Sequence, residues 1–274
     1  MNYDLFVCPE CKGNIKYVLC DKCGYEVKSP ENNIKTFLGP GSFKLHSRDD
    51  LDARWLKLKT NKFSTEMIKF VAKRLKGMKG RALDVGCGTG YYSVNIQRRL
   101  GNDVFFVGLD IDSSFDPGVV SENYSFVHAD FFNHPFQRQS FDIVVNFDVI
   151  EHIEDDTGFV GKIIDLLKKD GVFIIGTPNG NRLPVKFYEL IHGRRSFPFS
   201  YGRDEVLGDI VHVREYNKNT LGELFNRFSE QVEFEIVPFL LGSRIVKEMI
   251  GLKYPGWFFG DYCYYWWIIG KKIK

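Results

Sequence analysis

The stretch 83-LDVGCGTGYYSVNI-96 places glycines at positions 86, 88 and 90, between an apolar run and an amphipathic one. A strand that runs into glycines and then into a helix presents free backbone N–H groups at the carboxyl edge of a sheet, where doubly wound folds bind ligands. The dinucleotide fingerprint is G-x-G-x-x-G, whereas the spacing here is G-x-G-x-G. The loop therefore predicts a ligand site, and its spacing disfavours a nicotinamide dinucleotide.

Two acidic residues narrow the class of ligand. Asp84 lies two residues before Gly86, where a carboxylate would repel a pyrophosphate but suits a ligand that carries an ammonium group and a positively charged sulfur. Asp110, at the end of the next apolar run, follows Gly86 by 24 positions. This separation is close to the roughly 20 residues that place a carboxylate on ribose hydroxyls. The two charges favour S-adenosylmethionine.

Apolar runs and helical periodicities alternate outward from this loop. The runs do not strictly alternate apolar with polar residues, which is typical of parallel strands covered on both faces. The fold class is therefore α/β, with a doubly wound sheet. We expect two helices between residues 49 and 76, strands at 81–85, 104–110, 124–130, 141–147 and 171–177, helices at 89–100, 155–169 and 220–228, and closing strands at 232–241 and 261–272.

Four of the six cysteines form two C-x-x-C hooks near the start of the chain: Cys8, Cys11, Cys20 and Cys23. Two such hooks can place four thiolates around one Zn²⁺ at about 2.3 Å. Paired disulfides and a redox C-x-x-C are the alternatives, but a cytosolic chain disfavours the first and the lack of a flanking βαβ pattern disfavours the second. We expect a structural zinc ribbon over residues 1–41, ending at Gly39-Pro40-Gly41, and a main domain over 42–274.

The composition is that of an ordinary globular chain, with 274 residues, 44% hydrophobic residues and a formal net charge of +2. The start of the chain lacks the pattern of a secretory signal, and no apolar run reaches the roughly 18 residues of a membrane span, so we expect a cytoplasmic protein. Basic residues gather between residues 44 and 99 and again between 182 and 203. These patches are either solvated faces or surfaces for an anionic substrate.

Four motifs, LDVGCGTG, GLDID, 129-ADF-131 and FDIVVNFDVIEHI, resemble the class I S-adenosylmethionine-dependent methyltransferases in order and spacing. The branch with an E-H-I/V/L element after the fourth strand, which contains quinone and sugar methyltransferases, is the most similar. The resemblance covers about residues 50–272. It implies a Rossmann-like sheet of seven strands whose last strand is antiparallel.

The resemblance also implies which residues bind the cofactor. It places Asp84, Gly86, Gly88 and Gly90 at the methionine end, Asp110 at the ribose, Ile111 beside adenine, Asp130 and Phe131 at the adenine edge, and Asn146 and Phe147 beside the reactive methyl. The N-terminal hooks, CPECKGNI and CDKCGYEV, resemble small zinc-ribbon domains that accompany some methyltransferases, including a clade that acts on ribosomal RNA guanine.

Two histidines are candidate catalytic residues, because methyl transfer to a hydroxyl needs a base near neutral pKa. His152 follows the strand whose tip faces the transferred methyl. In the pattern D-x-x-E-H, Asp148 and Glu151 could join His152 in ligating Mg²⁺ or Zn²⁺, as in some quinone O-methyltransferases of this branch, or the pattern could simply cap the next helix. His212, in H-V-R-E-Y, either lies above the pocket or anchors a loop.

The sequence favours O-methylation of a small metabolite such as a sugar or quinone, under a roof formed by residues 180–209. A basic, aromatic roof suits an anionic or glycosylated acceptor. An RNA methyltransferase is the first alternative, supported by the zinc ribbon and the basic residues 44–99. The ribbon itself is not basic, however, and the fourth strand lacks an N-P-P-aromatic element. The second alternative is an inactive methyltransferase fold that docks a partner, which the complete set of cofactor residues disfavours.

Overall fold

The computed structural model describes residues 5–16, 19–27, 35–38, 47–112, 115–204, 208–239 and 260–274. The expected domain boundary at residues 39–41 lies outside these ranges, as do the last two residues of the strand expected at 232–241.

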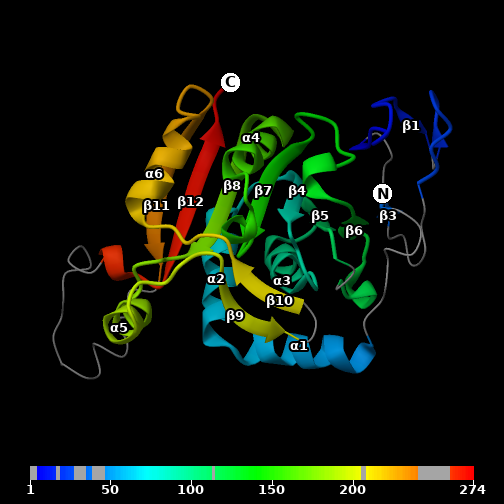
Figure 1. The fold of residues 1–274 in the computed structure, drawn as a ribbon. Helices are drawn as coiled ribbons and strands as arrows, with labels where there is room; N and C mark the ends of the chain where they lie inside the picture. Colours follow the sequence, from blue (N-terminus) through cyan, green and yellow to red (C-terminus); the bar gives the residue numbers. More distant parts are fainter. Residues whose placement is uncertain are drawn as a thin grey trace.

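The centre of the fold is an eight-stranded sheet with the order β11-β12-β8-β7-β4-β5-β6-β3 (Figure 1). Strands β4 to β8 are parallel, and β12 pairs antiparallel with both β8 and β11. The predicted doubly wound sheet with an antiparallel last strand is therefore confirmed. The strands are β3 (Lys35–Thr36), β4 (Gly80–Val85), β5 (Val104–Asp110), β6 (Tyr124–His128), β7 (Phe141–Phe147), β8 (Leu167–Pro178), β11 (Val232–Phe239) and β12 (Tyr265–Lys272).

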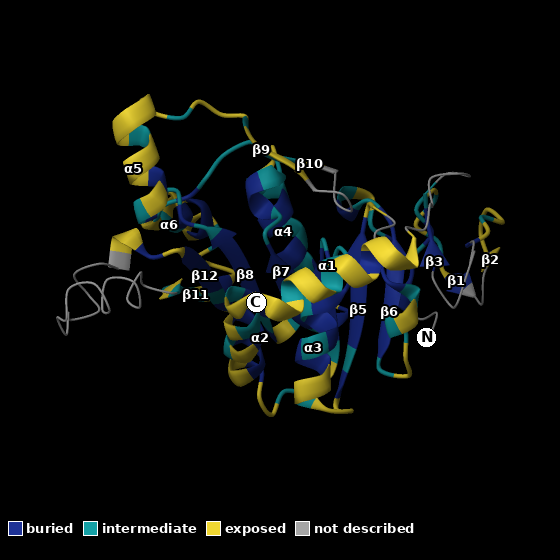
Figure 2. Cartoon of the chain, turned by 90° about the horizontal axis from the view of Figure 1, so that it is seen from below, coloured by how far each residue is buried: buried dark blue, intermediate teal, exposed yellow. Residues whose placement is uncertain are grey.

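Helices cover both faces of the sheet, because alternate strand residues point to opposite sides. Leu83 and Val85 join one hydrophobic cluster, whereas Ala82 between them joins the other. One face packs against α2 and α3, and the opposite face packs against α4 and α6. Figure 2 shows the strands buried between these layers. The helices are α1 (Arg48–Thr60), α2 (Lys62–Arg74), α3 (Tyr91–Leu100), α4 (Asp156–Leu166), α5 (Leu183–His192) and α6 (Lys218–Asn226).

The boundaries of several elements differ by a few residues from the expectation, including the ends of α4 and α6 and the start of β12. Helix α3 begins at Tyr91 rather than Thr89, because Gly90 has the left-handed conformation (φ +79°) that ends the preceding turn. Strand β8 begins at Leu167, directly after α4 ends at Leu166, rather than at 171. The loosely patterned segment after β8 contains α5 and a hairpin of β9 (Phe199–Asp204) and β10 (Gly208–His212).

The cysteine-containing segment packs directly on the sheet. Its β1 (Ile15–Lys16) and β2 (Leu19–Cys20) form a small antiparallel pair, and β3 extends the main sheet beside β6. Phe6 stacks between Phe37 and Phe136, at centroid distances of 5.3 and 5.7 Å. Backbone bonds from Val7 N–H to the Pro135 carbonyl (2.6 Å) and from Gln137 N–H to the Leu5 carbonyl (3.0 Å) fasten the contact. The small segment therefore shares the hydrophobic core of the main domain.

None of the helices in the described ranges has the length and apolar character that crossing a bilayer requires.

Truncating Phe6 should loosen this contact. We expect Phe6→Ala to lower the free energy of unfolding by about 3–5 kcal/mol, because the ring is fully buried and its loss leaves a cavity between two other rings. Leu19→Ala, in the same segment but half exposed, should change it by less than about 0.5 kcal/mol. Equilibrium urea unfolding measures both, and equal effects of the two variants would contradict the packing described.

Candidate active site

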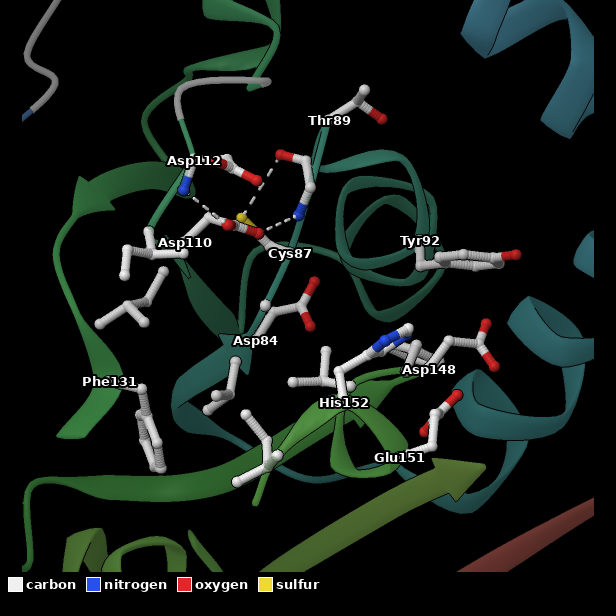
Figure 3. Close-up of a pocket in the computed structure, with 18 of the residues that line it drawn as sticks. Asp84, Cys87, Thr89, Tyr92, Asp110, Asp112, Phe131, Asp148, Glu151 and His152 are labelled. Atoms are coloured by element: carbon white, nitrogen blue, oxygen red, sulfur yellow. Dashed lines mark hydrogen bonds between the residues drawn. The ribbon is translucent and has the colours of Figure 1, made fainter. Parts of the chain in front are cut away.

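A cavity of about 620 Å³ opens at the carboxyl ends of β4, β5 and β7. Its walls come from the loops after these strands and after β6, with α1 and β10 closing the sides. Figure 3 shows Asp84 between two groups of residues, with Asp110 and Phe131 on one side and Tyr92, Asp148 and His152 on the other. We call these sides the nucleoside end and the acceptor end.

The glycine turn needs its glycines for two physical reasons. Gly86, Gly88 and Gly90 all have positive φ (71°, 52° and 79°), which side chains rarely adopt. A Cβ added at Gly86 would also lie 2.3 Å from a methyl of Val149. Gly86 and Gly88 line the cavity, whereas Gly90 starts α3 and packs against Phe115. The turn thus brings bare backbone to the cavity wall.

Asp110 holds this turn in place. One of its carboxylate oxygens accepts the Gly88 N–H at 2.7 Å and the other accepts the Asp112 N–H at 2.9 Å. The side chain lines the cavity, and burial raises its pKa to about 6. Asp110 therefore connects the turn after β4 to the turn after β5, the position expected for a carboxylate that binds ribose hydroxyls.

Asp84 is the most unusual residue of the cavity. Only 1% of it is exposed, and its Oδ1 has no hydrogen-bond partner within the described part of the chain. Burial, reinforced by the nearby charge of Asp110, raises the pKa of Asp84 to about 7. A buried carboxylate oxygen without a partner is costly unless a cation neutralises it. This residue fits the ammonium group of a bound methionine moiety.

The nucleoside end also has an apolar wall. Ile111 is 58% exposed and lines the cavity, and Phe131 packs edge-on against Phe159 at 5.0 Å. Asp130 accepts the Phe132 N–H at 2.9 Å and so fixes the loop that carries Phe131. These residues form a wall that suits a flat purine.

Of the two residues expected beside the reactive methyl, the structure places one at the cavity and buries the other in the sheet. Phe147 lines the cavity and stacks on Tyr92 at 5.0 Å. Asn146 is fully buried in β7, and its Nδ2 donates to the Val85 carbonyl at 2.7 Å. Asn146 thus supports the strand that leads into the glycine turn.

At the acceptor end the structure brings both candidate histidines together. The rings of His152 and His212 lie 4.8 Å apart and nearly perpendicular, at 86°. His152 Nδ1 is 2.7 Å from the Val211 carbonyl, which can only accept, so the proton is on Nδ1 and Nε2 is left as an acceptor. Burial lowers the pKa of His152, so its neutral form prevails at neutral pH.

Glu151 completes this group, and Asp148 lies close by. Glu151 is fully buried, its Oε2 accepts from Thr177 at 2.9 Å, and its Oε1 has no partner among the described residues. Burial raises its pKa well above the usual range, and burial also raises the pKa of Asp148 to about 6. Ligand atoms of Glu151, His152 and His212 lie within 4.8 Å of one another, so His212, rather than Asp148, joins the pair that the pattern D-x-x-E-H suggested.

The expected basic roof has a different role in the structure. Within residues 180–209, the described part contributes only Asp209 to the cavity wall, and helix α5 lies away from it. Arg182 and Arg195 are paired with Glu215, a residue that the sequence analysis did not single out. Its only sequence signal was its place in H-V-R-E-Y.

The four N-terminal cysteines lie together as expected. Their Sγ atoms are all within 4.8 Å of one another, with the pairs Cys8–Cys23 and Cys11–Cys20 at 3.5 Å. Four thiols converging in this way fit a closed tetrahedral Zn²⁺ site, which stabilises a fold but leaves no position for a substrate. Zinc would be held by Cys8, Cys11, Cys20 and Cys23.

Comparison with known proteins agrees with this geometry. Residues 83–175 match the family described as "Methyltransferase domain". A Mycolicibacterium smegmatis protein named "Probable S-adenosylmethionine-dependent methyltransferase" is 33% identical over 157 residues, covering 55% of this chain and 52% of its own length. A ubiquinone biosynthesis O-methyltransferase of Rhodopseudomonas palustris is 33% identical over 122 residues, covering 40% of this chain and 45% of its own length.

The fold agrees as well. The crystal structure of an S-adenosylmethionine-dependent methyltransferase from Mesorhizobium loti superposes with a TM-score of 0.53 at 13% identity, covering 78% of this chain and 99% of the other. These matches support a class I S-adenosylmethionine-dependent methyltransferase, and the family match itself covers residues 83–175. The chain spans about half the length of the curated relatives described above. Asp84, Asp110 and the glycine turn of this methyltransferase domain fit the cofactor, and the earlier preference for S-adenosylmethionine over a nicotinamide dinucleotide is confirmed.

Removing the charge of Asp84 should weaken ligand binding but stabilise the ligand-free protein. We expect Asp84→Asn to weaken binding of S-adenosylhomocysteine roughly 10- to 100-fold, because a buried ion pair with the ligand ammonium is lost. The same variant should raise the free energy of unfolding of the ligand-free protein at pH 8. The folded-state pKa of about 7 lies above that of the unfolded chain, so the stability linked to this group is lost as pH rises through 7, and asparagine avoids the loss.

Isothermal titration calorimetry and urea unfolding measure the two effects. Asp103→Asn is the matched control, since Asp103 is exposed, pairs with Lys79 at 3.2 Å and lies outside the cavity. Unchanged affinity in Asp84→Asn would contradict the assignment of this carboxylate to the ligand.

Zinc content provides a further check. We expect about one zinc per chain by atomic emission, and Cys11→Ser should lower both the zinc content and the melting temperature, because a missing thiolate opens the tetrahedral site. Cys263→Ser, at a buried cysteine of the main domain, should keep the zinc. The metal site would be excluded if the wild-type protein contained no zinc and Cys11→Ser melted at the same temperature as the wild type.

Proposed function

We propose that this chain transfers a methyl group from S-adenosylmethionine to a hydroxyl of a small, uncharged acceptor such as a sugar or a hydroquinone. The Nδ1–H tautomer of His152 carries the proposal, because it leaves an unprotonated Nε2 in a residue that lines the acceptor end of the cavity. A neutral imidazole so placed is suited to remove a hydroxyl proton. The similarity to an O-methyltransferase of ubiquinone biosynthesis supports the choice of oxygen as the methylated atom.

When bound, S-adenosylmethionine supplies an electrophilic methyl on a positively charged sulfur and leaves as S-adenosylhomocysteine. The protein aligns the acceptor oxygen with this methyl, so that the O–C bond forms as the S–C bond breaks. His152 Nε2 takes the hydroxyl proton, and its Nδ1–H stays bound to the Val211 carbonyl. Tyr92 and Phe147, which stack on each other, form an apolar wall on the acceptor side.

Charge at the acceptor end favours a neutral acceptor over the anionic one that the basic roof suggested. Among the lining residues there, the carboxylates of Asp148 and Asp209 outnumber the one arginine, Arg54, while burial keeps Glu151 protonated by raising its pKa. The two roof arginines, Arg182 and Arg195, are engaged by Glu215. A free carboxylate or phosphate would therefore meet repulsion, and a polyhydroxylated neutral molecule would find several hydrogen-bond acceptors.

The same residues support a second candidate for the reaction, a divalent cation that orients the acceptor. Ligand atoms of Glu151, His152 and His212 lie within 4.8 Å of one another, and carboxylate and imidazole ligands suit Zn²⁺ or Mn²⁺. This candidate predicts loss of transfer on dialysis against a chelator, with recovery when the metal is returned. The base mechanism predicts no change.

The acceptor class can be tested with methyl-labelled S-adenosylmethionine and a matched panel of neutral sugars, dihydroxybenzenes, their carboxylated counterparts and total RNA, read by mass spectrometry. We expect transfer to a hydroxyl of a neutral compound, with weaker transfer to its carboxylated counterpart. Transfer to RNA alone would overturn the metabolite proposal. Failure to bind S-adenosylhomocysteine would instead indicate an inactive docking protein.

Substitution of the base gives a sharper result. We expect His152→Gln to reduce kcat roughly 10²- to 10⁴-fold with affinity for S-adenosylhomocysteine unchanged, since the residue acts on the acceptor proton only. The wild-type rate should rise with pH and level off below pH 6.5, because burial lowers the pKa of His152. His192→Gln, on exposed α5, is the control. A kcat of His152→Gln equal to that of the wild type would exclude His152 as the base.

A further inference from the structure

Glu215 is a buried hub that connects the roof to the acceptor end. It lies between β10 and α6, and only 1% of its side chain is exposed. Arg182 donates to both carboxylate oxygens at 3.1 Å, and Arg195 donates to one of them at 2.8 Å. Tyr201 donates its hydroxyl to the other oxygen, and His212 Nδ1 lies 3.1 Å from that same oxygen. Four side chains from residues 182–212 thus converge on one carboxylate.

These contacts keep the carboxylate charged. Burial alone would raise the pKa of Glu215, but hydrogen bonds from His212, Arg195 and Tyr201, with the charge of Arg182, hold that pKa well below its usual range. An ionised carboxylate can only accept hydrogen bonds. The proton of His212 that faces Glu215 must therefore be on Nδ1, which leaves Nε2 of the neutral ring as an acceptor.

Both histidines of the acceptor end are then held in the same way. His152 donates Nδ1–H to a backbone carbonyl, and His212 donates Nδ1–H to a carboxylate. A partner on one ring nitrogen fixes both the tautomer and the orientation of an imidazole, which is how carboxylates support catalytic and metal-binding histidines elsewhere. The nearly perpendicular rings of His152 and His212 therefore have defined positions.

We propose that Glu215 is a positioning residue for His212, and that Arg182, Arg195 and Tyr201 clamp it so that the roof and this histidine form one unit. The residues of this clamp come from along the roof, residues 180–209, and from the end of β10. Arg182 is the N-cap of α5, Arg195 follows α5, Tyr201 is in β9 and His212 ends β10. The backbone reinforces the connection, since Gly180 N–H donates to the Tyr216 carbonyl at 2.8 Å. The role in catalysis rests on the proposed function, whereas the fixed tautomer does not.

Long-range ¹H–¹⁵N spectra of the histidine rings test the inference on the whole protein bound to S-adenosylhomocysteine. In the wild type, neutral His212 should show the Nδ1–H tautomer. In Glu215→Gln, where an amide replaces one carboxylate oxygen, this tautomer should become mixed, and His152 should keep its own. An Nε2–H tautomer for His212 in the wild type would overturn the proposal even if the variant fails to fold.

Glu189→Gln is the matched control, because Glu189 also pairs with Arg195, at 3.4 Å, and with Lys186, but no bond connects it to His212 within the described residues. It should leave the spectrum of His212 and the affinity for S-adenosylhomocysteine unchanged. With the neutral acceptor that gives the fastest transfer, Glu215→Gln should lower kcat at least about tenfold, and Glu189→Gln should not.

The two proposals can fail separately. Equal losses of kcat in Glu215→Gln and Glu189→Gln would reduce Glu215 to a structural ion pair and contradict the positioning role. Loss of the His212 tautomer in Glu215→Gln, in a protein that methylates no hydroxyl, would preserve the positioning role and reject the proposed function.

Discussion

The carboxylate of Asp110 makes the interaction on which the site depends. It accepts N–H groups from Gly88 and Asp112, and so fastens the turn after β4 to the turn after β5. The parallel sheet brings these two turns side by side, because β4 and β5 are neighbours with Asp84 paired opposite Gly108. The Asp110 carboxylate adds to the backbone bonds from the Gly86 and Cys87 N–H groups to the Leu109 carbonyl (2.8 and 3.1 Å), which hold the same positive-φ turn.

This arrangement trades stability for binding. Two carboxylates are buried close together, and burial raises the pKa of both. Natural proteins retain such groups where function needs them, since an unpaired buried charge opposes folding. A cationic group of the ligand neutralises the unpaired carboxylate of Asp84. The unfavourable free energy of burying that carboxylate in the ligand-free protein is thereby removed, which favours binding. The acceptor end also contains a buried carboxyl group, that of Glu151, whose Oε1 lacks a hydrogen-bond partner among the described residues.

Sequence patterns predicted the sheet and the position of the glycine turn at its carboxyl edge, because those features are local. The glycine turn, Asp84, Asp110 and the strand ends lie within short motifs whose spacing fixes the backbone geometry. The pairing of β3 with β6, which adds an eighth strand to the seven expected, could not be predicted in the same way, because it depends on packing around Phe6. The N-terminal segment was expected to form a zinc ribbon, and in the structure it also shares the hydrophobic core of the main domain.

The acceptor end was harder to predict, because its side-chain contacts join residues that are far apart in the sequence, on either side of the roof or within it. Glu215 is separated from Arg182 by 33 residues and from Arg195 by 20, and nothing in the local sequence pairs them. As a result, the arginines were interpreted as a surface for an anion, although the structure buries them against a carboxylate. His152 and His212 were identified individually, but their perpendicular arrangement follows from strand β10 and the loop after β7 lying side by side.

Ligand binding at this site depends on a buried carboxylate, Asp84, that meets the ammonium group of the nucleoside. Calorimetric titration of S-adenosylhomocysteine in buffers of different ionisation enthalpy tests it most directly, because it counts the protons exchanged on binding. At pH 6.5 Asp84 is largely protonated before the ligand arrives, so we expect net proton release on binding. The release should fade to none as the pH rises well above 7. Binding with no proton release at pH 6.5 would contradict this role of Asp84.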